Sequence, residues 1–355
     1  MESYASVQKL RLIKRQFDNK CLTINILSRD KLLIWGERKN LGLLIVLFQY
    51  KPPSPMYVFD TDKLTEIFCD CHDFCQVFTP YWHQHTLPGP YMNKSRLDES
   101  ELMAILLFYH LSGFKCFKYY YQGFVLKHLR NDFPDLLSYS RFVEVIPSVL
   151  PYLYAYVNVW RRGEATGIYY VDSAKLPVCH NLRIFSHKVF ENIAQRGKTS
   201  TGWFFGLKIH LIINQVGELM RVLLTSGNVS DKNCDLLEKL AANLQGLLFG
   251  DRGYVSKKAA DKLREQGLKL IYKFQKNMKD ILMPYQEKIL SRKRGIVETV
   301  IDLLKNICNI DHTRHRSPLN AITHVFAGVA AYTHLDHLPS ISYQKLNWLD
   351  QKVAL

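Results

Sequence analysis

Two aspartates in the sequence each follow a short apolar run with the character of a buried strand. Asp172 comes directly after residues 168–171, and Asp251 comes directly after residues 247–250. Ligands gather at the carboxyl ends of strands in an open α/β sheet, so neighbouring strands would bring these two carboxylates together. Like charges that close raise each other's pKa unless a cation lies between them. Because oxygen-only ligation suits Mg²⁺ or Mn²⁺, Asp172 and Asp251 predict a divalent metal site.

A third carboxylate for this site is expected from Glu298, on a helix further along the chain. At roughly 100° per residue, Glu298 shares one helix face with Arg294 and Lys305. A separate arc of the same helix carries the apolar side chains Val297, Val300, Ile301, Leu304 and Ile307. We therefore expect the apolar arc to pack on the sheet and Glu298 to complete the metal site. Arg294 and Lys305 are expected to hold DNA phosphates beside it.

Each of these acids also has an ordinary structural explanation. An Asp after a strand is often a turn former or a helix cap, and a Glu between two cations is often part of a solvated ion pair. The combination favours the metal site, because two acids at strand ends, one helical acid with flanking cations and a basic surround occur together.

Four other side chains are candidate DNA contacts. Lys208 and His210 lie on a predicted strand beside Asp172, where they either touch DNA or make structural hydrogen bonds. Trp203 either stacks on a base, as aromatic side chains do on exposed bases, or packs in the core. Arg252, inside the second acidic motif, is predicted to bind DNA.

The elements that must position these residues follow from apolar periodicity between 164 and 340. We predict strands at 168–172, 207–213, 219–224, 247–249 and 268–274, and helices at 233–244, 257–266 and 291–309. The order is three strands, helix, strand, helix, strand, helix. That order is typical of an RNase H-like fold, an α/β architecture with a mixed sheet flanked by helices.

Residues 56–163 are predicted to form an α-helical domain. Asp98 followed by Glu101 resembles a capping box before an apolar run. Two further helices are expected, at residues 114–129 and 140–160. Exposed Lys, Arg and Tyr on these helices favour a DNA-end-binding domain of helix-turn-helix type. A helical cap on the following domain is the alternative.

The two ends of the chain are less informative. Residues 1–55 are a poorly defined basic extension that ends in a Pro-rich break at 51–55. Either the extension lies outside the working protein, or it forms a small arm that contacts DNA. The catalytic domain is assigned to residues 164–340, and residues 341–355 form a C-terminal tail.

Charge favours a polyanionic partner. Lys and Arg number 47 against 32 Asp and Glu, a formal net charge of +15. Residues 252–316 alone hold 16 Lys/Arg and 7 Asp/Glu, a local net of +9 around the expected Glu298 helix. Phosphate neutralisation releases counterions, so DNA fits this surplus, although ribosomal RNA or an anionic membrane would satisfy the total charge equally.

No run of 18 apolar residues and no secretory signal is present, so we expect no membrane partner and a cytoplasmic location. The eight cysteines should then stay reduced. Cys69, Cys71 and Cys75 lie close to His72, which leaves a zinc site open. The alternative is that these cysteines act as small apolar residues on a helix.

Several motifs together resemble the transposases of bacterial insertion sequences in the nine-eighty-two group. They are residues 172–173 (DS), 177–181 (PVCHN), 187–188 (HK), 196–198 (RGK), 201–210 (TGWFFGLKIH), 227–229 (GNV) and 250–254 (GDRGY). Arg294, Glu298 and Lys305 match the Arg-x3-Glu-x6-Lys part of a wider transposase signature. Ser291 stands where that signature begins with Tyr.

The resemblance, which covers about residues 56–337, implies an RNase H-like fold and a catalytic triad of Asp172, Asp251 and Glu298. It implies a DDE transposase that binds two Mg²⁺ or Mn²⁺ ions, cuts DNA at terminal inverted repeats and joins the free 3′-hydroxyl to target DNA. A dimer is expected when two DNA ends are bound. The alternatives are an RNase H-like nuclease without strand transfer, and an inactive element copy that only binds DNA.

Overall fold

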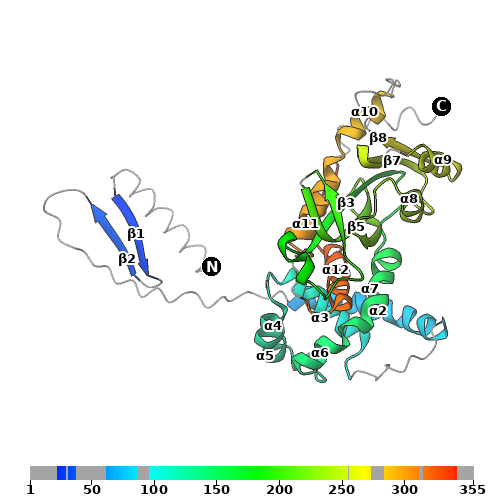
Figure 1. The fold of residues 1–355 in the computed structure, drawn as a ribbon. Coiled ribbons are helices and arrows are strands. Elements are labelled where there is room, and N and C mark those ends of the chain that lie inside the picture. The colour runs from blue at the N-terminus through cyan, green and yellow to red at the C-terminus, as the bar shows by residue number, and fades with distance from the viewer. Residues whose placement is uncertain are drawn as a thin grey trace. The chain divides into compact units, whose positions relative to one another are not determined.

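The computed structural model forms two compact units, Met1–Phe59 and Asp60–Leu355 (Figure 1). It describes residues 22–28, 31–36, 61–85, 96–200, 202–254, 256–272, 284–311 and 315–341. In the first unit, β1 (Leu22–Ser28) pairs antiparallel with β2 (Lys31–Gly36). The rest of the predicted extension 1–55, and the predicted tail beyond residue 341, lie outside the described residues.

The second unit is built around a mixed six-stranded sheet. Its strands are β3 (Ile168–Cys179), β4 (Gln195–Thr199), β5 (Gly202–Asn214), β6 (Leu219–Ser226), β7 (Gly246–Gly250) and β8 (Leu268–Tyr272). The order is β4-β5-β3-β7-β8, and β6 pairs with the second half of β5. The pairs among β3, β5, β4 and β6 are antiparallel, whereas β3–β7 and β7–β8 are parallel.

This topology confirms the predicted RNase H-like sheet, in which three antiparallel strands are extended by two parallel ones. β4 was not predicted, because its polar sequence Gln-Arg-Gly-Lys-Thr has no apolar alternation. β3 also does not end at Asp172. It continues for seven residues to Cys179, and six of these seven residues pair with β5. Pairing between the strands, rather than local apolarity, maintains this extension.

Helices cover both faces of the sheet. Tyr169 and Val171 point to the face covered by α8 (Cys234–Leu240) and α9 (Lys257–Glu265), where they join one apolar cluster. The intervening Tyr170 points to the other face and donates from its hydroxyl to the Leu290 carbonyl of α10 (Tyr285–Arg292) at 3.3 Å. α11 (Gly295–Asn306) contacts β3.

The predicted helix 291–309 corresponds mainly to α11, and its first two residues belong to α10. α10 ends at Arg292 and α11 begins at Gly295. Glycine is a poor residue for a helix interior, which helps to explain the break. Ser291 consequently lies on α10, whereas Glu298 lies in the first turn of α11.

A helical region precedes the sheet, as predicted. Its elements are α2 (Thr61–His85), α3 (Glu99–Leu111), α4 (Phe117–Tyr120), η1 (Tyr121–Val125), α5 (Leu126–His128), α6 (Tyr139–Val145), η2 (Ile146–Val149), α7 (Leu150–Ala155) and η3 (Tyr156–Trp160). The expected capping box is present, and the Asp98 amide donates to the Glu101 carboxylate at 2.9 Å.

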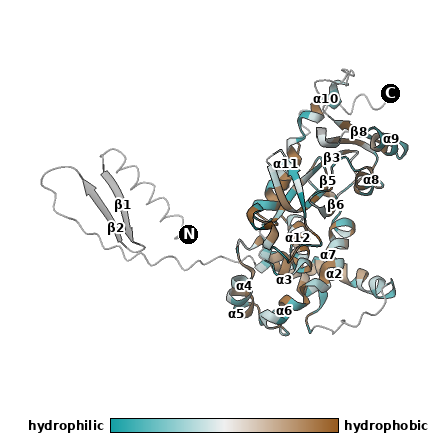
Figure 2. Ribbon diagram, viewed as in Figure 1, coloured by the Kyte–Doolittle hydropathy of each residue, from teal (hydrophilic) through white to brown (hydrophobic). Residues whose placement is uncertain are grey.

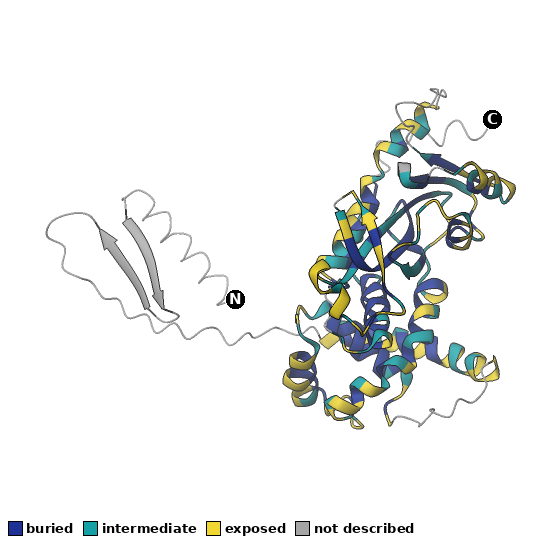
Figure 3. Ribbon diagram, in the orientation of Figure 1, coloured by how far each residue is buried: buried dark blue, intermediate teal, exposed yellow. Residues whose placement is uncertain are grey.

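A helix that was not predicted, α12 (Pro318–Tyr332), joins the helical region to the rest of the unit. Its residues are buried on nearly all sides, and it packs against α3 and α7. Figures 2 and 3 show apolar and buried residues concentrated where α3 and α12 meet. The helical region and the sheet therefore share a packed interior.

The continuous helical stretch Tyr139–Trp160 is long and apolar enough to cross a membrane by length and composition alone. Half of its most apolar window is buried inside the unit, where η2 packs on α3 and α12, and η3 packs on β6. The core helix of a soluble protein passes the same test, so the observation is weak evidence for a membrane span.

Candidate active site

The parallel pairing of β3 and β7 brings Asp172 and Asp251 to the same level of the sheet. The register pairs Tyr169 with Leu248 and Tyr170 with Phe249. Continued by two residues, it sets Asp172 beside Asp251. Asp172 is half-buried within β3, whereas Asp251 follows β7 and is exposed.

Glu298 reaches this pair from α11 through a shared cation. One guanidinium nitrogen of Arg294 donates to Asp172 Oδ2 at 3.2 Å, and the other donates to Glu298 Oε1 at 2.8 Å. The arginine immediately precedes the helix that carries Glu298. The structure thus brings the three predicted acids together, although they are 126 residues apart in sequence at the extremes.

The electrostatics of Asp172 show how crowded this site is with negative charge. The pKa of Asp172 is raised to about 6, mainly by burial and also by the nearby carboxylates of Asp251 and Glu298. The amide of Ser173, which donates to Asp172 Oδ1 at 2.8 Å, and the charge of Arg294 oppose that rise. A site of this kind favours additional positive charge.

The donor set fits a divalent metal ion. Asp172, Asp251 and Glu298 offer only carboxylate oxygens, which are the hard ligands that Mg²⁺ and Mn²⁺ prefer. Arg294 already supplies one cation between two of the three acids. Asp251 and Glu298 are exposed, so the site is open to solvent and to a large substrate.

Arg294 and Lys305, which were predicted to hold phosphates, both pair with acids of the protein. Arg294 faces the acids, so it would have to exchange these partners before it could hold a phosphate. Lys305 lies two turns beyond Glu298 on the same helix face, where it pairs with Asp311 at 3.7 Å. The side chain of Arg252 is outside the described part of the structure, so its predicted DNA contact stays a prediction.

The prediction that Lys208 and His210 contact DNA does not fit the structure. Lys208 is buried, and its ammonium donates to the Val229 carbonyl at 2.9 Å and lies 3.4 Å from Asp231 Oδ1. His210 is fully buried, with Nε2 2.9 Å from the Thr225 hydroxyl. Burial lowers the pKa of His210, which favours the neutral ring. Both side chains hold the β6–α8 loop instead.

Asp231 precedes α8 but does not cap it. The cap of α8 is Asn233, whose side chain accepts from the amides of Asp235 and Leu236. Asp231 instead faces Lys208 and His210, at 3.4 and 3.6 Å. A Cβ on Gly253, two residues after Asp251, would lie 3.7 Å from the Asp231 carboxylate.

Tyr254 also lies near the site, although it was not among the predicted site residues. Its ring belongs to the core beneath α8 and α9, and its hydroxyl is buried without a hydrogen bond of normal geometry. Burial and the charges of Asp231 and Asp172 raise the pKa of Tyr254 well above its usual range. The motif around Asp251 was the available signal, since Tyr254 ends it.

Trp203 is exposed on β5, so the prediction that it is available for stacking fits better than core packing. Arg196 and Lys198 on β4 lie over its ring, 5.9 and 5.5 Å from the ring centroid. Neither cation was singled out from the sequence. Their positions follow from the unpredicted pairing of β4 with β5.

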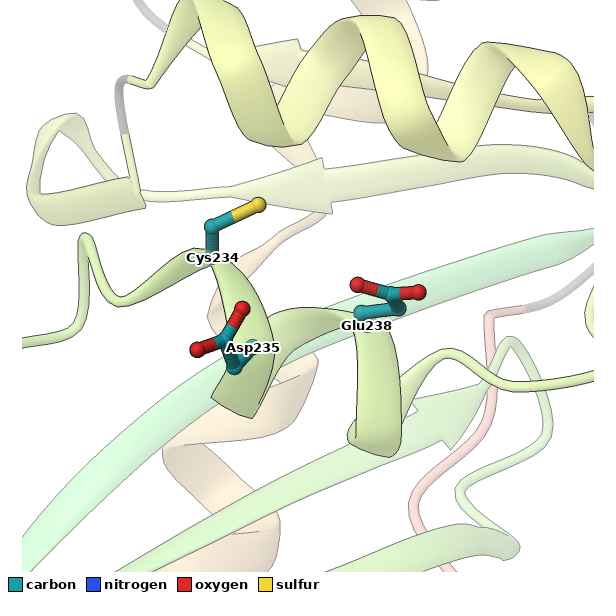
Figure 4. Close-up of side chains that lie close together, drawn as sticks. All are labelled: Cys234, Asp235 and Glu238. Carbon is teal, nitrogen blue, oxygen red and sulfur yellow. The ribbon is translucent and has the colours of Figure 1, made fainter.

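The zinc site left open at Cys69, Cys71, Cys75 and His72 does not form. Cys71 and Cys75 are buried along α2 as apolar side chains, while Cys69 is exposed. Among the described residues, the group with possible ligand atoms within 4.8 Å of one another is Cys234, Asp235 and Glu238 (Figure 4). These lie on the short helix α8, and its two acids are exposed and have no further feature that points to a metal.

Comparisons with known proteins found a solved structure and a family model that this chain resembles. A piggyBac transposase synaptic complex with hairpin DNA, solved by cryo-electron microscopy, has a TM-score of 0.42 and 12% identity, over 78% of this chain and 72% of that chain. No curated protein sequence matches the chain. Residues 162–318, which contain all six strands of the sheet and the three acids, match the family model described as the transposase DDE domain.

Proposed function

We propose that the protein is a DNA transposase that cleaves phosphodiester bonds at the ends of a mobile element and joins the freed 3′-hydroxyl to target DNA. Asp172, Asp251 and Glu298 would be the catalytic and metal-binding residues. The nine-eighty-two group of bacterial insertion sequences is the proposed subfamily, and the bacterial cytoplasm is the proposed place of action. Two DNA ends would be held by a dimer.

One observation carries this proposal. Asp172 on β3 and Glu298 on α11 share a single arginine, and the β3–β7 register sets Asp251 beside Asp172, within the segment that matches the transposase DDE domain. An ordinary surface ion pair would not require burial of Asp172, with the pKa rise that the burial causes. The arrangement is better explained as a site for positive charge at a bound phosphodiester.

The three carboxylates would hold Mg²⁺ or Mn²⁺. Two such ions, when bound, supply Lewis-acid activation of the phosphodiester and of the attacking hydroxyl. The residues of the chain orient the acids: the Ser173 amide fixes one oxygen of Asp172, and Arg294 ties the other oxygen to Glu298. Positioning and charge stabilisation, without a covalent protein intermediate, would be the contribution of the protein.

DNA is the proposed partner in two forms, the terminal inverted repeats and the target. The helical region 56–163 is the proposed reader of the repeats. The surplus of Lys and Arg in residues 252–316 would bind backbone phosphates around the acids. Trp203, Arg252 and, after exchange of its partners, Arg294 are the proposed side-chain contacts.

The test is strand transfer by the purified full chain with Mg²⁺, using DNA that carries the ends flanking this reading frame. Wild type should cut and join, and Asp172→Asn, Asp251→Asn and Glu298→Gln should each abolish both steps while retaining DNA binding. Asp302→Asn is the matched control, because Asp302 is an exposed acid one turn beyond Glu298 on α11. Cleavage by any of the three variants would remove that residue from the triad.

Two alternatives are separated by the same assay. A nuclease without strand transfer would cut but would not join a pre-cut 3′-end. An inactive element copy would bind DNA without Mg²⁺-dependent cutting. The meeting of all three acids favours the enzyme over the second alternative, whereas Ser291 at the usual tyrosine position favours inactivity.

A further inference from the structure

A group of exposed side chains follows the end of β3, and we call it the wedge patch. It consists of Leu182 and Phe185 on η4 (Asn181–Ser186), Trp203 on β5, and Arg196 and Lys198 on β4. Leu182, Phe185 and Trp203 are 88%, 95% and 56% exposed. Single exposed apolar residues are common, but two on one short turn beside a cation-flanked tryptophan are unusual.

The wedge patch is held in place by a hydrogen bond and by packing against buried residues. The Asn181 side-chain amide donates to the Trp203 carbonyl at 2.8 Å, which ties η4 to β5. Ile184, between the two exposed residues, packs toward a buried cluster that contains Phe190 and Phe205. The structure therefore turns Ile184 inward and presents its neighbours Leu182 and Phe185 to solvent.

β4 is equally well anchored. It pairs with β5 from Gln195 to Thr199, with Lys198 opposite Trp203. A Cβ on Gly197 would lie 2.1 Å from the Gly227 carbonyl, so the strand rests closely on the loop after β6. Arg196 and Lys198 are held beside the indole by this pairing.

The chemistry of the wedge patch matches nucleic acid. Residues 181–203 contain four Lys/Arg (Arg183, Lys188, Arg196, Lys198) and one acid, Glu191. Cations alone would serve for duplex DNA, since a paired duplex offers phosphates and base edges but no free base faces. The rings of Trp203 and Phe185 and the side chain of Leu182 can contact base faces only where bases are unpaired or a base step is opened.

The distance along β5 from Trp203 to the level of Asp172 can be compared with the length of a DNA duplex. Trp203 and Leu211 are eight residues apart on β5, so alternation places them on the same face, and Leu211 pairs with Asp172. At about 3.3 Å per residue, the separation is roughly 26 Å. That length corresponds to about eight base pairs of duplex at 3.4 Å each.

We propose that the wedge patch binds DNA whose base pairing is open, with an unpaired base stacked on Trp203 and with Phe185 and Leu182 filling the gap in the duplex. Arg196 and Lys198 hold the adjacent phosphates. This proposal rests on the proposed function, because it places the opened base pair about eight pairs from the bond that the three acids would cut.

The test is fluorescence anisotropy with the full chain and two fluorescein-labelled 30-base-pair DNAs, one fully paired and one with a three-nucleotide mismatched bubble. Their sequence is arbitrary, since stacking on aromatic side chains tolerates any base. EDTA is present throughout, so that no cleavage occurs. Wild type is expected to bind the bubble at least fivefold more tightly than the duplex.

Trp203→Leu and Phe185→Ser should each weaken binding to the bubble about tenfold, which corresponds to a typical stacking energy for one base. Binding to the paired duplex should change less than twofold. Trp203→Phe, which retains a flat ring, should recover most of the affinity. Val77→Ser, at a 65% exposed apolar side chain on α2, is the matched control and should change neither affinity.

Three results would overturn the proposal. They are an absence of bubble preference in wild type, an equal loss on both DNAs in the Trp203 and Phe185 variants, and a change of oligomeric state in Phe185→Ser, measured by light scattering, without loss of bubble preference. The last would make the patch an interface between copies. Asp251→Asn should keep the bubble preference, so a failure of cleavage in the proposed function is distinguishable from a failure here.

Discussion

The β3–β5 strand pair carries charged side chains on both of its faces, and the two faces treat them in opposite ways. On one face, Asp172 shares Arg294 with Glu298, and the arginine and both acids remain partly accessible. On the other face, Lys208 and His210 meet Asp231 in a buried cluster with protein partners.

The difference shows that residue type alone does not distinguish a functional site from a cluster that only stabilises the fold. Both faces combine carboxylates with cations next to the same strands, and both gave rise to predicted functional residues. Buried charges need fixed partners, so a closed cluster favours one arrangement of the loop that carries it. An accessible cluster can exchange its partners for a metal ion or a phosphate.

The largest effect is expected on the face that carries Asp172, Arg294 and Glu298, which we call the open face. Asp172→Ala should reduce strand cleavage by at least about 10³-fold, as loss of an essential catalytic group does. Its thermal stability should change little, because the substitution removes a desolvated acid from a site rich in negative charge. Residual cleavage above 10% of wild type would show that the open face is not the catalytic one.

The face that carries Lys208, His210 and Asp231 is called the closed face. A substitution there should lower stability instead of cleavage. Asp231→Ala leaves Lys208, whose side chain is 8% exposed, without its acidic partner. The free energy of unfolding, measured with urea, should fall by about 3–5 kcal/mol. Asp302→Ala, at an exposed acid, is the control and should stay within about 0.5 kcal/mol of wild type. A stable Asp231→Ala protein would contradict the assignment of this cluster as a support.

Metal binding should also distinguish the open face from the closed face. Mg²⁺ at 100 times its dissociation constant should stabilise the wild type by about 2.7 kcal/mol if it binds only the folded chain. Asp251→Asn should lose most of that gain, and Asp231→Asn should retain it after its lower starting stability is subtracted. An equal Mg²⁺ response in both variants would place the ion elsewhere.

The pH dependence of stability should report the closed face through His210. Its folded pKa is lowered by burial below the ordinary value of about 6.5, so the unfolded chain binds the proton more readily. The stabilisation is therefore present above pH 6.5 and is lost as the pH falls below it. A loss of about 1.4 kcal/mol corresponds to each pKa unit of lowering. His210→Gln should flatten the acid limb of a urea-stability profile, and an unchanged limb would be inconsistent with a neutral, buried ring.

The smallest effect is expected at the edge of the open face. Lys305 is partly accessible and pairs with Asp311 at 3.7 Å, an arrangement worth about 0–1 kcal/mol. Lys305→Ala should change cleavage at saturating DNA by less than about threefold and weaken DNA binding slightly at low salt. A loss as large as that of Asp172→Ala would move Lys305 into the reaction site.

Much of this architecture follows from local sequence. The apolar runs 168–171 and 247–249 predicted β3 and β7, the capping box predicted the start of α3, and the 3.6-residue periodicity of Val297, Val300 and Leu304 predicted the buried face of α11. These signals are local, because they depend on residues within a turn or a strand of one another.

Long-range contacts decided the rest. β4 is polar and becomes a strand only by pairing with β5, which also brings Arg196 and Lys198 to Trp203. The meeting of Asp172 with Glu298 depends on where α11 packs, and the burial of Lys208 and His210 depends on the loop that closes over them. By itself the sequence determined which residues could carry the chemistry and the elements that hold them. Only the tertiary structure decided which of those charges are open to exchange and which are closed, because exposure is a property of the packed neighbours and not of the side chain.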